Sequence, residues 1–244
     1  VLMQPSDYCS ISYLALLMSR FTIHVLEKGV TGRNLRIAAC KSQACLCDST
    51  DAPDPPLDMR TIFVDRLDLD ASLPLSGIRV EGELDDVAFI EYTSGSTGRP
   101  KSVATQQFRI SHWGRWHQYH YPQGDARVAY NLFFIWYWQI SLQQGSTCVI
   151  TPTRENLDIQ ALMKTCERHR VAWINCLTPG LLSALLHVST ELPKDLRVMY
   201  CGGEALPMDT ARQWLKRWPE VELINNYALT EVAADMAFCH MTPE

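Results

Sequence analysis

Short apolar runs alternate with amphipathic stretches along the second half of the chain. The apolar run Thr147–Ile150 is followed by Leu157–Arg168, in which apolar residues recur with helical spacing. The same order continues with the predicted strands Val171–Cys176, Leu196–Cys201 and Val221–Ile224 and the predicted helices Gly180–Val188 and Met208–Arg217. Strands that alternate with helices of about three turns predict a parallel sheet covered on both faces.

The first half of the chain is less regular. Ile11–Met18 predicts a helix, Ala44–Cys47 a short strand, and the proline-rich stretch Asp51–Asp58 a linker. We therefore expect a divergent N-terminal subdomain over residues 1–84, with its linker near residues 51–58, and an α/β subdomain over residues 85–244.

Composition and charge exclude several classes of function. The 244 residues are 47% apolar and 20% charged, which is ordinary for a globular protein. A net charge of −5 and a pI near 5.8 provide no basic surface for nucleic acid. The aromatic run Leu132–Leu142 is too short to span a bilayer, and the start lacks the charged region of a signal peptide. Nine cysteines, several of them inside apolar runs, favour buried thiols in a reducing cytoplasm.

A polar stretch with the sequence YTSGSTGRPK, Tyr92–Lys101, follows the short apolar run Val87–Ile90. Its glycines allow consecutive backbone N–H groups to turn toward one anion, and Lys101 supplies a charge that suits phosphate. The stretch is not the common G-x-x-x-x-G-K-[ST] loop, because a proline precedes the lysine. The alternative is a polar surface loop. The residues that we expect to bind phosphate are Thr93, Ser94, Gly95, Ser96, Thr97, Gly98 and Lys101.

This stretch resembles the [ST]SG[ST]TG-x-PKG signature of the adenylate-forming superfamily. Three later stretches resemble further segments of that family in the same order, namely Asn131–Gly145, CGGEALP at 201–207 and NNYALTE at 225–231. The sequence GGEALP is most similar to the corresponding segment in adenylation domains of nonribosomal peptide synthetases. The resemblance is clear over residues 85–241 and weak before them.

The resemblance implies a fold and an activity. The fold would be the large N-terminal core of an adenylate-forming enzyme, an α/β core whose parallel or mixed sheet is flanked by helices. Such an enzyme uses ATP and Mg²⁺ to convert a carboxylic acid into an acyl-adenylate and pyrophosphate. The partner would be a carrier-protein domain of a larger synthetase, with no nucleic acid and no membrane involved. The family's C-terminal domain would follow Glu244, so we expect a truncated chain with little activity of its own.

The resemblance also assigns roles around the nucleotide. The phosphate-binding loop would hold the β- and γ-phosphates, Thr230 would bond the α-phosphate, and Glu231 would help to hold Mg²⁺, a hard cation that prefers oxygen ligands. Lys101, Thr230 and Glu231 are thus the expected catalytic residues. Without the resemblance, the later patterns would predict only a strand-to-helix turn and a helix start. The residues expected to bind the purine are Gly202, Gly203, Glu204, Asn225 and Tyr227.

The acid-binding segment departs from its relatives. Alignment places Leu132 at the aspartate that binds a substrate ammonium and Tyr137 at the family's glutamate. Leucine cannot neutralise a buried ammonium, so we expect an acid without an α-amino group, such as an aryl, keto, hydroxy or alkyl acid. A β-amino acid bound by Asp235 is the second choice. The expected pocket residues are Leu132, Phe133, Trp136, Cys176, Met199, Cys201, Asn226, Ala234 and Asp235.

Two alternatives remain open at this point. An acyl- or aryl-acid CoA ligase would differ in the C-terminal domain. A degenerate, non-catalytic module is favoured by Leu132, Ser102 and Ala228, which depart from the family's pattern, whereas the intact phosphate loop and the intact pair Thr230–Glu231 argue against it.

Overall fold

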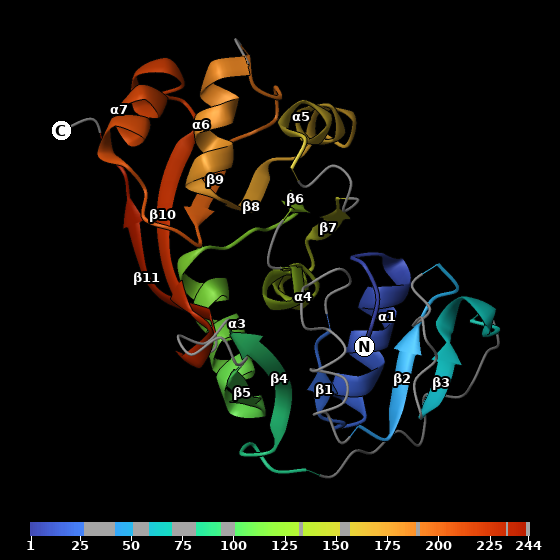
Figure 1. The fold of residues 1–244 in the computed structure, drawn as a ribbon. Helices are drawn as coiled ribbons and strands as arrows, with labels where there is room; N and C mark the ends of the chain where they lie inside the picture. Colours follow the sequence, from blue (N-terminus) through green and yellow to red (C-terminus); the bar gives the residue numbers. More distant parts are fainter. Residues whose placement is uncertain are drawn as a thin grey trace. The chain divides into compact units, whose positions relative to one another are not determined.

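The computed structural model describes residues 1–26, 42–50, 59–69, 82–93, 101–131, 134–151, 157–188, 191–232 and 234–242. The chain forms two compact units, Val1–Ile110 and Ser111–Glu244 (Figure 1). The expected α/β fold, with a mixed sheet flanked by helices, is confirmed. The expected division between residues 84 and 85 stays a prediction.

The first unit contains helix α1 (Asp7–Met18) and two small sheets. The helix begins earlier than the predicted Ile11, because the Ser6 side chain caps it by accepting a hydrogen bond from the backbone N–H of Cys9. In the first sheet β4 lies between β1, to which it is parallel, and β5, to which it is antiparallel; β2 and β3 form a separate parallel pair. The strands are β1 (Ile23–His24), β2 (Ala44–Cys47), β3 (Arg60–Phe63), β4 (Val87–Thr93) and β5 (Lys101–Gln106), and the 3-10 helix η1 (Val64–Arg66) follows β3.

The second unit is built on a six-stranded sheet in the order β11-β10-β9-β8-β6-β7. All neighbouring strands are parallel except β10 and β11, which are antiparallel. The connection between these two strands, which includes the 3-10 helix η3 (Thr230–Val232), is too short for the crossover that a parallel pair requires. The strands are β6 (Arg127–Tyr130), β7 (Thr147–Ile150), β8 (Trp173–Leu177), β9 (Val198–Gly202), β10 (Glu222–Leu229) and β11 (Ala234–His240).

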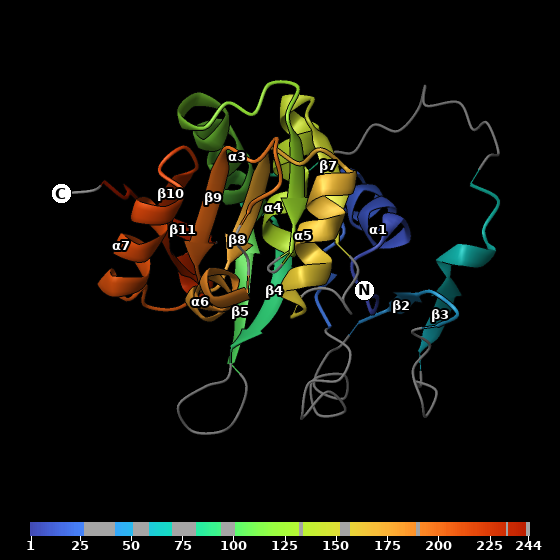
Figure 2. The ribbon, with the colours of Figure 1, turned by 90° about the horizontal axis from the view of Figure 1, so that it is seen from above.

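Helices cover both faces of this sheet (Figure 2). One face packs against α5 (Ile159–Arg168), α6 (Pro179–Val188) and α7 (Met208–Arg217), around a core that includes Met199 and Leu223. The other face packs against α3 (Gln107–His120) from Ser111 onward and against α4 (Phe134–Gln144). In the described part of the chain, no helix is long and apolar enough to cross a membrane.

Local sequence explains the helices on the first of these faces. The side chain of Asp158 caps α5 by accepting hydrogen bonds from the backbone N–H groups of Gln160 and Ala161. Pro179 starts α6, where a missing backbone N–H has no cost. Trp214 of α7 is fully buried and donates its indole N–H to the Val221 carbonyl 3.0 Å away. These helices pack over one face of the parallel strands.

Candidate functional site

The expected purine-binding residues lie where β9 and β10 run side by side to the carboxyl edge of the sheet. Gly202 is the last residue of β9 and pairs with Asn226 of β10. Gly203 follows with a φ of 85°, a left-handed conformation that favours glycine. Beyond it Glu204 is exposed, and Tyr227 is 57% exposed. Ligands of open α/β sheets bind at this edge.

A glycine is required at position 202 because the neighbouring strand leaves no space for a side chain. A Cβ at Gly202 would lie 2.9 Å from the backbone oxygen of Asn226 and 3.3 Å from the Asn226 Cβ. Backbone atoms held in a sheet cannot move aside at low cost, so a side chain at this position would push β9 and β10 apart. The glycine thus allows the two strands to approach each other closely.

Thr230 and Glu231 begin η3, the short helix between β10 and β11. Thr230 is half-buried and Glu231 is exposed, so the Glu231 carboxylate is open to solvent. The strand β10 extends past the predicted end at Ile224 as far as Leu229, and therefore carries the whole NNYAL stretch up to this turn.

The expected phosphate-binding stretch belongs to the first unit. Its two ends are paired, because Thr93 ends β4 opposite Lys101, which begins β5. Lys101 is exposed. Residues Ser94, Gly95, Ser96, Thr97 and Gly98 lie outside the described residues.

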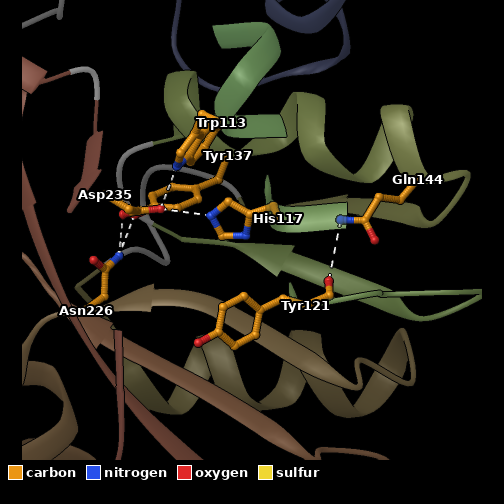
Figure 3. A network of polar contacts seen from close by, with 7 residues as sticks. All are labelled: Trp113, His117, Tyr121, Tyr137, Gln144, Asn226 and Asp235. Atoms are coloured by element: carbon orange, nitrogen blue, oxygen red, sulfur yellow. Dashed lines mark hydrogen bonds and ion pairs between the residues drawn. The ribbon is translucent and has the colours of Figure 1, made fainter. Parts of the chain in front are cut away.

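A buried polar network centres on Asp235 of β11 (Figure 3). Its Oδ1 lies 2.6 Å from the Tyr137 hydroxyl and 2.6 Å from Asn226 Nδ2. Its Oδ2 lies 2.9 Å from Trp113 Nε1 and 2.9 Å from His117 Nε2. Only 1% of the Asp235 side chain and 2% of the His117 side chain are exposed. The carboxylate therefore has two partners on each oxygen.

The direction of each hydrogen bond follows from the chemistry of the donors. The indole Nε1–H of Trp113 and the amide Nδ2–H of Asn226 can only donate. Burial, and then the nearby Asp235 carboxylate, raises the pKa of Tyr137 well above its usual value, so the phenol stays protonated and donates. An ionised carboxylate accepts only, so His117 presents Nε2–H. Asp235 thus collects four donors.

Sequence reasoning did not identify three members of this network as site residues. Trp113 and His117 lie four residues apart on α3, and their rings meet edge to face at 4.8 Å. Tyr137 lies on α4, with its ring 5.4 Å from that of Trp113. The spacing of Trp113 and His117 on one helical face was the available signal, because residues i and i+4 are neighbours.

The structure brings together some of the expected pocket residues. Asn226 and Asp235 meet in the network, and Cys176 of β8 lies near Asp235 and Cys201, both of which raise the pKa of its thiol further after burial. Cys176 has a φ of 63°, unusual for a residue with a side chain, at a shift of the strand register. Burial raises the pKa of Cys201 to about 12.

Other expected pocket residues are not brought into this network. Met199 and Cys201 are fully buried in the core on the opposite face of the sheet, beneath α5, α6 and α7. Leu132 and Phe133 lie outside the described residues. Trp136 belongs to α4 and Ala234 to β11, but their side chains lie outside the described part of the structure.

Comparison with known proteins identifies one family model and several related proteins. The family model described as "AMP-binding enzyme" matches residues 1–244. The chain is 34% identical over 159 residues to glycine betaine reductase ATRR of Emericella nidulans, a match that covers 62% of this chain and 12% of that protein. It is 31% identical over 201 residues to phosphinothricin tripeptide synthetase PhsB of Streptomyces viridochromogenes, covering 79% and 16% respectively.

A solved structure has a similar fold. The o-succinylbenzoate coenzyme A synthetase of Bacillus subtilis, determined in complex with ATP and magnesium ion, superposes with a TM-score of 0.81 at 19% identity. The match covers 99% of this chain and 51% of that chain. The chain therefore spans about half the length of this synthetase, and a much smaller share of the two larger relatives.

Proposed function

The chain belongs to the AMP-binding enzyme family, and from this premise we propose that it serves as an adenylation domain that activates a carboxylic acid with ATP. In this reaction a carboxylate oxygen attacks the α-phosphorus, the bond to the β-phosphate oxygen breaks, and pyrophosphate leaves with the bonding electrons. The observation that carries the proposal is the accessible edge at the ends of β9 and β10, where Glu204, Tyr227 and Glu231 are exposed beside the buried Gly202.

The residues at this edge fit a nucleotide with its metal. Gly202 and Gly203 leave the backbone open to a flat base, and the exposed ring of Tyr227 offers a surface for stacking. The Glu231 carboxylate would hold Mg²⁺ and Thr230 the α-phosphate. When bound, Mg²⁺ supplies positive charge next to the phosphates. Lys101 would add a further positive charge to the leaving pyrophosphate.

We further propose that the acid lacks an ordinary α-ammonium group. The resemblance to adenylation domains places Leu132 at the position where those domains carry the aspartate for that ammonium. Asp235 does not substitute for the missing aspartate, because both of its oxygens already accept two hydrogen bonds. This saturation argues against the second choice, a β-amino acid bound directly to Asp235.

The product would pass to the thiol of a carrier-protein domain, and ATP would come from the cytoplasm. The relationship to a named peptide synthetase supports this partner. A CoA ligase would instead transfer the acyl group to free coenzyme A, and an assay of both thiols separates the two outcomes. A non-catalytic module would give neither product.

Exchange of labelled pyrophosphate into ATP tests the proposed function. In the whole protein as its gene encodes it, we expect Lys101→Ala and Glu231→Gln each to lower acid-dependent exchange by at least about tenfold, mainly in kcat. These groups meet charge that moves in the transition state, which is why turnover should suffer more than KM. Normal exchange in both variants would refute the assignment.

His169→Ala is the matched control for these two variants. His169 is half-buried at the C-terminal end of α5, on the opposite side of the sheet from the Asp235 network. We expect the pyrophosphate-exchange rate of His169→Ala to equal that of the unsubstituted protein. A loss equal to that of Lys101→Ala would show that the effect of Lys101→Ala is not specific to the expected phosphate site.

A further inference from the structure

Asn226 has a buried side-chain oxygen next to the network around Asp235. The residue is 3% exposed and lies on β10 opposite Gly202, where β9 ends. Its Nδ2 lies 2.7 Å from the Tyr137 hydroxyl and 2.6 Å from Asp235 Oδ1. Its Oδ1 is buried and has no hydrogen-bond partner among the residues that the structure describes.

The orientation of this amide is fixed by its neighbours. Both hydrogens of Nδ2 are used, one by Tyr137 and one by Asp235. Tyr137 donates its own proton to Asp235, so both groups offer lone pairs to Asn226. A reversed amide would set Oδ1 against two acceptors and lose both hydrogen bonds. The Oδ1 atom therefore faces away from Asp235, as Figure 3 shows.

A buried acceptor held in this way is available for a hydrogen bond from a ligand. Buried polar atoms in proteins nearly always have a partner, and an unpaired acceptor loses its hydration without compensation. Asn226 also lies at the carboxyl edge of parallel strands, where ligands of such sheets bind. On its other side the strand faces Gly202, which has no side chain to reach the oxygen. A donor from a ligand would complete the network.

We propose that Asn226 Oδ1 accepts a hydrogen bond from a hydroxyl or N–H group on the acid, so that the substrate is an acid with a hydrogen-bond donor away from its carboxylate. The inference rests on the proposed function and narrows its substrate class. Asp235 and Tyr137 are positioning residues, because they hold the amide of Asn226 and do not touch the acid.

Matched acids test this proposal in the whole protein as its gene encodes it. The probes are hydroxy-, amino- and methoxybenzoates substituted at the same ring position, and the corresponding set of butanoates. We expect the best donor-bearing acid to exceed its methyl ether by at least about tenfold in kcat/KM for pyrophosphate exchange, because the ether leaves Oδ1 unpaired. The ratio of kcat/KM for the hydroxy-substituted acid to that for the amino-substituted acid shows whether the preferred donor is O–H or N–H.

Variants then assign the discrimination to Asn226. Asn226→Leu removes the acceptor. It should therefore reduce the ratio of kcat/KM between the donor-bearing acid and its methyl ether to about one. Tyr137→Phe keeps the ring but frees one N–H of the amide, and should lower the ratio severalfold even if Asn226→Leu fails to fold. Tyr200→Phe is the control, because the Tyr200 hydroxyl is another buried group without a partner in the described part, on the neighbouring strand β9. Its ratio should not change.

The outcomes separate this inference from the proposed function. Exchange with none of the acids would overturn both. Exchange that is equal for hydroxy acids and their ethers, or a preference that survives in Asn226→Leu, would overturn the inference and leave the proposed function intact. Thermal stabilisation by sulfamoyladenosine analogues of the same acids gives a second readout without turnover, and should follow the same order.

Discussion

At the scale of single residues, the arrangement around Asp235 shows how one carboxylate can hold several elements together. Its four donors come from α3, α4 and β10, and each is a neutral group or a histidine. Hydrogen bonds to a charged acceptor are stronger than those between neutral groups. A buried carboxylate is stable only if its lone pairs are satisfied, which the network achieves.

Asp235→Asn should therefore destabilise the protein. An amide at this position turns one N–H₂ group toward two donors, whichever way it rotates. We expect the free energy of unfolding in urea to fall by about 2–4 kcal/mol, as for other broken buried charge networks. Urea denaturation followed by tryptophan fluorescence measures this loss.

Asp209→Asn provides the matched comparison. Asp209 is 87% exposed in its side chain and pairs with Arg212 one turn along α7. Exposed pairs of this kind contribute little, so the free energy of unfolding should change by less than about 0.5 kcal/mol. Equal losses in the two variants would contradict the role given to the Asp235 network.

At the scale of elements, the close approach of β9 and β10 sets the position of the site. β9 ends at Gly202, whereas β10 continues to Leu229 and turns through η3 into the antiparallel β11. The antiparallel return carries Asp235 back beside Asn226, nine positions earlier in the chain. The mixed character of the sheet is thus part of how the network forms.

Gly202→Ala should weaken the packing of these two strands. The added Cβ would lie 2.9 Å from a backbone oxygen of Asn226, so the strands must separate. We expect a loss of about 1–3 kcal/mol in the free energy of unfolding, typical of overpacking in a core. The same variant should bind ATP more weakly, since the strand ends carry the expected purine site.

Gly180→Ala is the control for this substitution. Gly180 lies in the first turn of α6, and a Cβ there meets nothing within 4 Å. Alanine stabilises a helix more than glycine does. The free energy of unfolding of the variant should therefore be unchanged or higher by up to about 1 kcal/mol. A destabilised Gly180→Ala would show that the loss in Gly202→Ala is not specific to the strand contact.

At the scale of the whole molecule, binding of ATP with Mg²⁺ should stabilise the folded protein. A ligand at about a hundred times its Kd adds about 2.7 kcal/mol to the free energy of unfolding. For a protein of this size we expect Tm to rise by about 5–10 °C. Differential scanning fluorimetry measures the shift, and EDTA should reduce it by removing the metal.

Lys101→Ala and Glu231→Gln should each reduce this rise in Tm. Glu231→Gln should also make the remaining shift less sensitive to EDTA, because the carboxylate would hold the metal. No shift at any ATP concentration in the unsubstituted protein would favour a non-catalytic module over an adenylation domain.

The sequence alone determined much of the architecture. The amphipathic pattern predicted α7 with its observed bounds and α5 with a start two residues earlier than observed. Apolar runs predicted β7 and the core strands β8 and β9 within two residues. These elements follow from local spacing and capping, which neighbouring residues carry. The same local reading missed β6 and β11 and did not identify α4 as a helix, because short or aromatic runs give no clear period.

Tertiary structure alone decided how the residues near the predicted acid site act. The sequence indicated Asp235 and Asn226 as pocket residues, but Trp113 and His117 lie 122 and 118 positions away from Asp235 along the chain. No local pattern can predict that four donors converge on one carboxylate, because the convergence depends on how α3 and α4 pack over the sheet. That packing engages Asp235 fully and leaves the buried oxygen of Asn226 without a hydrogen-bond partner among the residues that the structure describes.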